Sequence, residues 1–347
     1  MVQHSISTLK RLVLDGRLEA CVHGQIETLT RKETREGKPF FEMTLSDAEG
    51  RMVLRAWNDG PAFALCEGLS TGAFIEVCGE FTHGAAYGLE SRRWHCRELQ
   101  AGERESLLGG PSELREKQAA DFACIMAAAG SIGDPRLQAL TRLFFQEYGE
   151  RFRRAAAART VHHARRGGLV EHVAQMVRAA EAIAVVYPML NRDLLVTGVL
   201  FHDAGKLWEN AMPADGFQMP FDERGELLGH ITIGIELLNA LWRKLLASEQ
   251  SSGWTQLKPS SEDVRLHLLH LIAAHHGELQ FGSPIPPKTP EAWALHYIDN
   301  LDAKMEIISA GYTTSKHLAP RIQERAWPLP GNLVTPLPRF APNPTAL

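Results

Sequence analysis

The chain lacks the features that mark membrane proteins and disulfide-rich secreted proteins. Its 347 residues contain no apolar run of the roughly 20 residues needed to cross a bilayer, and residues 1–11 have no apolar core of signal-peptide length. The cysteines are scattered and form no CxxC pair: Cys21, Cys66, Cys78, Cys96 and Cys124. This argues against a zinc ribbon or a disulfide framework. We therefore expect reduced thiols in a cytoplasmic protein that does not insert into membranes.

An excess of positive charge is also missing. The chain has 37 lysines and arginines against 41 aspartates and glutamates, so its formal net charge is -4. No overall basic field favours nucleic acid, and any binding of a polyanion must depend on local patches. Because 347 residues are too many for one ordinary core, we expect at least two domains.

The first hundred residues are patterned as strands. Apolar and polar residues alternate over 24–29, 40–45, 51–57 and 72–79, and residues 46–50 predict a hairpin turn. This rhythm predicts a five-stranded OB-fold β-barrel over residues 1–100. A generic antiparallel barrel without a ligand fits the same pattern, because a fold does not dictate a function.

A basic and aromatic set lies in and between the first three of these predicted strands. Its members are Arg31, Lys32, Lys38, Phe40, Arg55 and Trp57. Cationic side chains attract phosphates and aromatic rings stack on bases, so the set predicts binding of single-stranded nucleic acid. In the alternative interpretation, Phe40 and Trp57 are core residues, and the acidic neighbours Glu33 and Glu36 dilute the patch.

The pattern changes after the barrel. Residues 101–112 are rich in glycine, glutamate and serine and are interpreted as a linker, and apolar spacing then predicts helices over 119–129 and 136–148. A basic stretch follows, in which Arg165 and Arg166 are candidates for contacts to nucleic-acid phosphates; a solvated helix face is the alternative. Prolines crowd residues 321–347, which predicts an extended tail.

An adjacent histidine and aspartate lie in an otherwise apolar stretch at residues 194–207. Burying His202 and Asp203 side by side is costly unless a partner offsets both, and a divalent cation does so best. If the stretch is helical, Lys206 lies one turn further and its ammonium can meet a substrate oxyanion in the same cavity. These residues predict a metal site that handles an anionic substrate.

Further imidazoles and carboxylates recur in apolar surroundings between residues 162 and 302. They are His172, His230, His275, His276 and Asp299. A lone histidine is more often an ordinary core residue, but together these groups exceed what a core tolerates without metal. Asp302 shares a helix face with Asp299 and is interpreted as orienting a ligand, with a plain ion pair as the alternative.

The order of these residues, H…HD…H…HH…D, resembles that of the HD-domain metal-dependent phosphohydrolases. The words GGLVEH at 167–172, FHDAGK at 201–206, HHGELQFGSP at 275–284 and DNLDAK at 299–304 look like those of the YhaM-type 3'-5' exoribonucleases. That family also places an OB-fold before its HD domain, so the resemblance extends over nearly the whole chain except the tail. Arg165 and Arg166 depart from the family pattern, in which an aromatic or aliphatic pair is expected.

Carried over residue by residue, the resemblance implies a site for two ions. The first ion would be held by His172, His202, Asp203 and Asp299. Asp203 would bridge to the second ion, whose site would be completed by His230, His275 and His276. Lys206 would neutralise a phosphate oxygen, and His163 is a second candidate for a phosphate contact. Such ligands suit Mn²⁺, Fe²⁺, Co²⁺ or Ni²⁺ better than Mg²⁺, and the resemblance favours Mn²⁺.

The prediction is therefore a multidomain α+β protein. It comprises an OB-fold at 1–100, a linker and helical segment at 101–160, an all-α HD phosphohydrolase domain at 161–320 and a Pro-rich tail at 321–347. We expect the barrel to capture single-stranded RNA, or ssDNA, and the metal centre to release 5'-mononucleotides from its 3' end by two-metal hydrolysis. The resemblance also implies a homo-oligomer. Two alternatives stay open: a nucleotide or cyclic-dinucleotide phosphohydrolase with a regulatory barrel, and a non-catalytic single-strand-binding protein.

Overall fold

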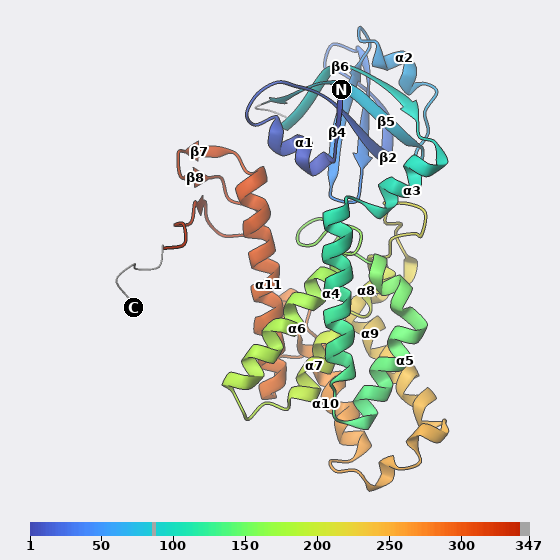
Figure 1. Cartoon of the computed structure of the whole chain (residues 1–347), viewed down its shortest axis with the longest axis vertical. Helices are drawn as coiled ribbons and strands as arrows, with labels where there is room; N and C mark the ends of the chain where they lie inside the picture. The colour runs from blue at the N-terminus through green and yellow to red at the C-terminus, as the bar shows by residue number, and fades with distance from the viewer. Residues whose placement is uncertain (85–87, 341–347) are drawn as a thin grey trace.

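The computed structural model describes residues 1–84 and 88–340, and it divides the chain into a strand-rich N-terminal part and a helical C-terminal part (Figure 1). Helix α4 (Ser112–Gly130) begins near the junction and runs down the helical part. This arrangement agrees with the predicted order of a β-barrel followed by helices.

Antiparallel strands form the N-terminal barrel. They are β2 (Leu18–Glu33), β3 (Pro39–Ser46), β4 (Arg51–Trp57), β5 (Phe74–Gly84) and β6 (Gly88–Glu98), paired in the order β4-β3-β2-β5-β6. Strand β1 (Val2–His4) pairs in parallel with β2, and β4 lies against β6, so the sheet closes. Helices α1 (Ile6–Leu12) and α2 (Ala62–Cys66) complete this part. Alternating residues such as Val22, Met43 and Leu54 fill the interior, which confirms the predicted OB-fold.

One prediction about the barrel is wrong. Cys21 on β2 lies directly opposite Cys78 on β5, and their sulfur atoms form a disulfide rather than remaining reduced. The two cysteines are 57 residues apart in the chain, so only the pairing of the strands reveals that they meet. Cys66, Cys96 and Cys124 are free thiols, as expected.

The helical part is built around one large core. After α4 it contains α5 (Pro135–Arg154), α6 (Gly168–Val186), α7 (Arg192–Phe201), α8 (Lys206–Glu209), α9 (Glu223–Leu246), α10 (Ser261–Ala274) and α11 (Pro290–Thr314). Phe144 and Phe201 are fully buried where α5 and α7 meet. The helices predicted at 119–129 and 136–148 are confirmed. The predicted linker is largely helical instead, because a capping box between Gln100 and Glu103 begins α3 (Ala101–Gly109).

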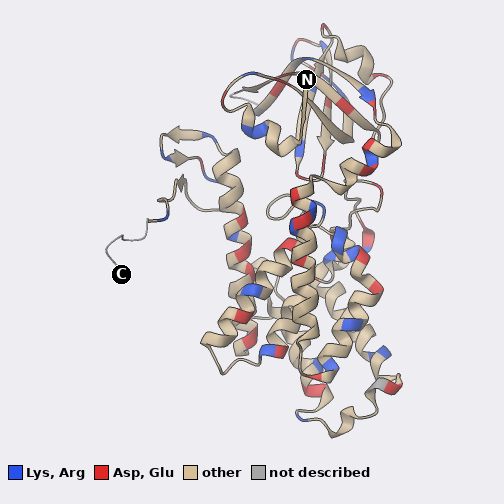
Figure 2. Cartoon of the chain, viewed as in Figure 1, with Lys and Arg blue, Asp and Glu red and all other residues tan. Residues whose placement is uncertain are grey.

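The C-terminal segment folds back on α11. Strands β7 (His317–Ala319), β8 (Ile322–Gln323) and β9 (Leu333–Val334) form a small sheet, and Leu329 and Leu333 pack on Ile307. Part of the predicted extended tail is therefore folded, and its residues 341–347 lie outside the described residues. The coloured ribbon of Figure 2 shows the positions of acidic and basic residues intermixed along both parts of the molecule. In the described residues, no helix combines the length and apolarity needed to cross a membrane.

Candidate metal centre

The predicted ligands converge on one place from five separate elements. Helix α6 supplies His172, the turn after α7 supplies His202 and Asp203, α9 supplies His230, the end of α10 supplies His275 and His276, and α11 supplies Asp299. The Nε2 atom of His172 lies 3.3 Å from Nε2 of His202 and 3.4 Å from Oδ1 of Asp299. Residues 194–207 do not form one continuous helix, because α7 ends at Phe201 and a turn separates it from α8.

Asp203 stands at the middle of this centre. Its Oδ2 atom lies 3.3 Å from Nε2 of His202 and 3.8 Å from Nε2 of His172. Its Oδ1 atom faces the other way, 3.7 Å from Nε2 of His230 and 3.8 Å from Nε2 of His275. The carboxylate thus joins two groups of imidazoles. The Lys206 ammonium donates to Oδ2 at 2.6 Å.

Each imidazole of the centre is oriented by an acceptor behind it. The Nδ1 atoms donate from His172 to Asp302 at 2.6 Å, from His202 to the Val199 carbonyl at 2.8 Å, from His230 to Glu209 at 2.7 Å, from His275 to the Ile272 carbonyl at 2.7 Å and from His276 to the Phe281 carbonyl at 2.6 Å. A carbonyl or carboxylate oxygen accepts, so we assign the proton to Nδ1 in every ring. The Nε2 atoms therefore point toward the centre, which is how proteins prepare histidines as metal ligands. Burial lowers the pKa of His172, but Asp299 and Asp302 outweigh it and raise this pKa to about 9, so the ring must release its Nε2 proton when a metal binds.

Three buried atoms at the centre have no hydrogen-bond partner among the described residues: Asp203 Oδ1, His230 Nε2 and His275 Nε2. Each such atom costs about 1–3 kcal/mol when left unsatisfied, so their convergence calls for a ligand. Burial lowers the pKa of His275 well below its usual value. Burial opposes ionisation of Asp203, but the charges of His202 and Lys206 outweigh it and hold its pKa well below the usual range. A neutral imidazole and an ionised carboxylate are the forms that bind a divalent cation, so the residues fit a metal.

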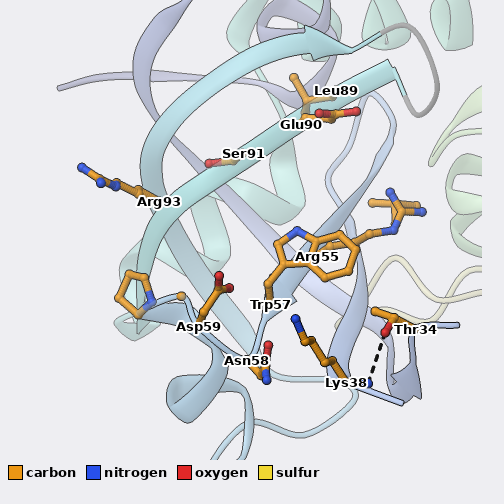
Figure 3. A pocket seen from close by; sticks show the side chains of 13 residues that line it. Thr34, Lys38, Arg55, Trp57, Asn58, Asp59, Leu89, Glu90, Ser91 and Arg93 are labelled. Atoms are coloured by element: carbon orange, nitrogen blue, oxygen red, sulfur yellow. Dashed lines mark hydrogen bonds between the residues drawn. The ribbon is translucent and has the colours of Figure 1, made fainter. Parts of the chain in front are cut away.

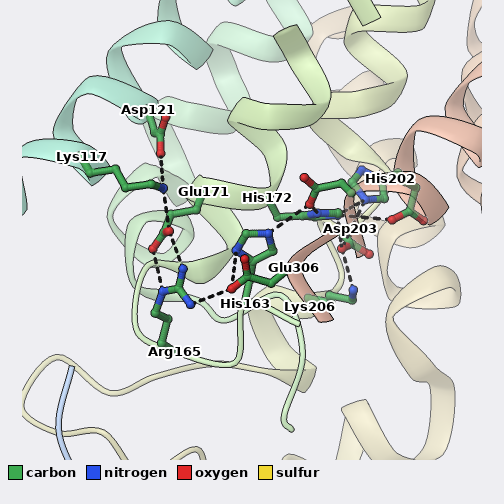
Figure 4. A network of polar contacts seen from close by, with 12 residues as sticks. Lys117, Asp121, His163, Arg165, Glu171, His172, His202, Asp203, Lys206 and Glu306 are labelled. Atoms are coloured by element: carbon green, nitrogen blue, oxygen red, sulfur yellow. Dashed lines mark hydrogen bonds and ion pairs between the residues drawn. The ribbon is translucent and has the colours of Figure 1, made fainter. Parts of the chain in front are cut away.

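His172 is held from behind by a second layer of polar groups (Figure 4). Asp302 accepts from His172 and also lies 3.1 Å from Nε2 of His163, so it holds the His172 ring in its orientation. His163 is only 2% exposed and lies on the far side of Asp302 from the Nε2 atoms of the centre. Through Asp302, His163 therefore supports the orientation of His172, and its expected phosphate contact stays a prediction. A side chain at Gly168 would lie 1.9 Å from the His163 carbonyl, so this close approach requires glycine.

Arg165 was predicted to contact nucleic acid, but its guanidinium is bound to carboxylates within the protein. Its Nε and Nη2 atoms donate to the fully buried Glu171 at 3.0 and 2.7 Å, and its Nη1 atom donates to Glu306 at 2.9 Å (Figure 4). Lys117 also donates to Glu171 at 2.7 Å. Burial alone would raise the pKa of Glu171, but Arg165, Gln118 and Lys117 lower it to about 2. Arg165 thus braces α6 behind the metal centre.

Arg166 is likewise directed into the protein. Its guanidinium donates to the carbonyls of Pro213 at 2.6 Å, Gly216 at 3.0 Å and Ala214 at 3.0 Å. These bonds hold the loop between α8 and α9, so the predicted phosphate contact of Arg166 is also corrected to a structural role.

His162 is a candidate that reasoning from the sequence missed. Its ring centroid lies 5.7 Å from that of His172, and the charges that act on it belong to residues of the centre. Burial and the charges of Lys206 and His172 lower the pKa of His162 to about 4, so it is neutral at pH 7. The adjacent histidines at 162 and 163 were the feature of the sequence that could have pointed to it. Which of the two faces the centre depends on a loop whose geometry includes a φ of 46° at His163.

The barrel carries a groove of about 620 Å³, lined mainly by β4, β6 and the turns beside them (Figure 3). Three of the predicted residues line it: Lys38, Arg55 and Trp57. Trp57 is 37% exposed and packs against Phe40 at a centroid distance of 4.8 Å with the rings tilted by 30°, so it is not a core residue. The remaining predicted residues, Arg31, Lys32 and Phe40, are not among those that line the groove.

Further groups line this groove. The structure adds Asn58, Ser91 and Arg93 to the lining, together with the acidic Asp59 and Glu90 (Figure 3). Sequence reasoning missed Arg93 because β6 joins β4 only through closure of the barrel.

Known proteins match the chain over both of its parts. The family model described as HD domain matches residues 169–304, the segment that contains every predicted metal ligand. The chain is 33% identical over 287 residues to the 3'-5' exoribonuclease YhaM of Bacillus velezensis, which covers 81% of this chain and 83% of that protein. It is 32% identical over 286 residues to the 3'-5' exoribonuclease YhaM of Bacillus subtilis, which covers 82% of this chain and 84% of that protein.

Proposed function

We propose that this chain, which belongs to the YhaM family of 3'-5' exoribonucleases, removes 5'-mononucleotides from the 3' end of single-stranded RNA at the centre around Asp203. The observation that carries the proposal is the Asp203 carboxylate, whose two oxygens face two sets of prepared imidazoles. The two relatives are named 3'-5' exoribonucleases, and the match to each covers most of this chain.

The donor set supports two divalent cations. We assign His172, His202, Asp203 and Asp299 to the first, and His230, His275 and His276 to the second, with Asp203 shared. Mixed imidazole and carboxylate ligands favour Mn²⁺ and fit Fe²⁺, Co²⁺ and Ni²⁺, whereas Mg²⁺ prefers oxygen ligands and retains its waters. Bound together, two such cations would neutralise the scissile phosphate and lower the pKa of a water that they hold.

The chain's own residues would bind and orient the phosphate. Lys206 places its ammonium beside Asp203 at the edge of the centre, where it can neutralise a nonbridging oxygen. The neutral His162 can donate one N–H to a second oxygen from the side of His172. Because His202 and His275 are fully buried, the attraction between charges at the centre is screened less by solvent than at the surface.

The groove on the barrel would hold the RNA strand. Trp57 offers an exposed ring for base stacking, and Lys38, Arg55 and Arg93 supply positive charge along the lining. Stacking and phosphate attraction are tolerant of sequence and do not require a 2'-hydroxyl, so single-stranded DNA is included as a second substrate.

We also propose that the protein assembles as a homo-oligomer, as its family resemblance implies. Trp293, Tyr297, Leu301 and Met305 follow one another at helical spacing along α11, and all are between 45% and 61% exposed. Such an apolar stripe supports packing against a second copy.

The proposal is tested by incubating 5'-labelled single-stranded RNA with the protein and Mn²⁺. We expect a ladder of progressively shorter labelled strands and release of nucleoside 5'-monophosphates. Asp203→Asn should abolish shortening, and the control Asp215→Asn, at an exposed loop residue, should not. Turnover of free nucleotides or cyclic dinucleotides with no shortening of RNA would replace the proposal by the alternative phosphohydrolase.

Metal content gives an independent check on the assigned ligands. His202→Ala should lose bound manganese relative to the parent protein, measured by elemental analysis after gel filtration. Unchanged manganese content would show that the ligands are assigned wrongly.

A further inference from the structure

Residues 210–222, the loop between α8 and α9, connect the metal centre to the barrel. The loop begins directly after Glu209, whose side chain accepts two hydrogen bonds from His230, one from Nδ1 at 2.7 Å and one from the backbone N–H at 3.0 Å. It ends at Asp222, which caps the start of α9. Both ends of the loop are therefore tied to the helices that present the centre.

The middle of the loop is inserted into the base of the barrel. Phe217 is only 2% exposed and packs in a small cluster with Ala48, Phe74 and Leu99 from the barrel side. The backbone N–H of Phe217 donates to Oε1 of Gln25 on β2 at 2.7 Å in a buried hydrogen bond. This contact joins residues that are 192 positions apart in the chain.

Gln25 is held in place within the barrel by its burial and by its own hydrogen bond. It is 8% exposed, and its Nε2 atom donates to the Gly72 carbonyl at 3.2 Å. A side chain at Gly216 would lie 2.8 Å from Oε1 of Gln25, so the loop backbone approaches this amide closely. The contact combines a buried ring with a buried hydrogen bond, and both are lost together if the barrel separates.

The opposite side of the loop is held by two arginines. Arg166 donates to three loop carbonyls, as described above, and Arg159 donates to the carbonyls of Glu209 at 2.8 Å and Pro220 at 2.9 Å. Arg51 of the barrel in turn donates to the Arg159 carbonyl at 3.4 Å. The loop is thus fixed between the barrel and the segment that carries His162.

We propose that Phe217 and Gln25 form a rigid joint that fixes the barrel groove relative to the metal centre, so that an RNA strand held in the groove is delivered to the centre without a search. The inference rests on the proposed function. Two binding sites that share one strand reinforce each other according to their effective concentration, which depends on how closely their geometry matches the strand. A fixed joint supplies that match in advance. Phe217 is therefore a positioning residue for long substrates only.

The test compares substrates of two lengths on matched variants in the presence of Mn²⁺. The substrates are a single-stranded RNA of about 20 nucleotides, long enough to occupy an OB-fold and the centre, and a dinucleotide that reaches the centre alone. Phe217→Ala should raise KM for the long RNA about tenfold or more while kcat and the dinucleotide rate stay within about twofold. The conservative Phe217→Leu should restore most of the loss. Phe221→Ala, at a 77% exposed phenylalanine of the same loop, is the control.

Gln25→Ala provides a second variant with a smaller change in volume, and it should raise KM for the long RNA in the same direction. Thermal melting and manganese content are measured on every variant, so a protein that has lost its fold or its metal is recognised. If both joint variants keep the wild-type KM for long RNA, or lose the dinucleotide rate equally, the inference is wrong and the proposed function stands. If the wild type does not shorten RNA at all, the proposed function fails and the inference fails with it.

Discussion

Gly205 offers a sharp test of how closely α8 and α9 must approach at the metal centre. It follows the His202-Asp203 turn with φ -68° and ψ -21°, a conformation that alanine adopts without strain. A Cβ at this position would nevertheless lie 1.9 Å from the backbone carbonyl oxygen of His230. Real Cβ atoms do not come within 3.0 Å of a neighbour, so in Gly205→Ala the His230 carbonyl must retreat by about 1 Å.

The size of the effect follows from this geometry. Overpacking costs about 1–3 kcal/mol, and the upper part of that range applies because backbone cannot rotate away as a side chain does. The carbonyl belongs to a residue whose imidazole is assigned to the second ion, and a displacement of about 1 Å at a reacting centre can cost on the order of 100-fold in rate. We therefore expect Gly205→Ala to lower stability by about 2–3 kcal/mol and kcat by about 100-fold.

The same substitution at Gly149 is the matched control. Gly149 lies within α5 and no atom lies within 4 Å of the position of its Cβ. Gly149→Ala should stabilise the protein by about 0.5–1 kcal/mol, because alanine favours the helix. Urea denaturation, manganese content and shortening of labelled RNA are measured on both variants. A Gly205→Ala protein with wild-type stability and wild-type rate would refute the reasoning.

Three more predictions concern the bracing of the centre and the groove. The folded pKa of Glu171 is about 2 against an ordinary 4.5, so its charge stabilises the fold above pH 4.5 and this contribution is lost as pH falls toward 2. Glu171→Gln should cost about 3 kcal/mol at pH 7 and roughly half as much at pH 3 in urea denaturation; a difference independent of pH would contradict this. Asp302→Asn should weaken manganese binding about 10- to 100-fold by calorimetry, since it disturbs the acceptor behind His172, and unchanged affinity would count against that role. Trp57→Ala should raise KM for long RNA about 5- to 150-fold, equivalent to one stacked base, with the dinucleotide unaffected; an equal loss on both substrates would argue against stacking.

Residue chemistry predicted that the site holds a metal, because buried imidazoles and carboxylates need a partner wherever they lie. The assignment of particular residues as ligands came from the family resemblance, and these residues converge around Asp203. Strand alternation and turn residues predicted the barrel for a similar reason, since the period of two assigns each residue to a face. These rules are local, and they can be read along the chain.

Such local rules do not predict contacts between segments that are far apart in the sequence. Nothing in the sequence pairs Cys21 with Cys78. The sequence likewise does not show that Arg165 binds Glu171 or that Arg166 binds the loop carbonyls. The choice between His162 and His163 depended in the same way on one loop conformation.

The His202-Asp203 pair and the recurring histidines by themselves predicted a metal centre, and strand alternation predicted the barrel that precedes it. Only the tertiary structure decided how the two parts are joined, which imidazoles face Asp203 Oδ1 and which face Oδ2, and that Phe217 lies against Gln25. The physical reason is that ligand chemistry belongs to the residue itself. Orientation and docking instead depend on burial and hydrogen bonds between segments that the chain brings together only when it folds.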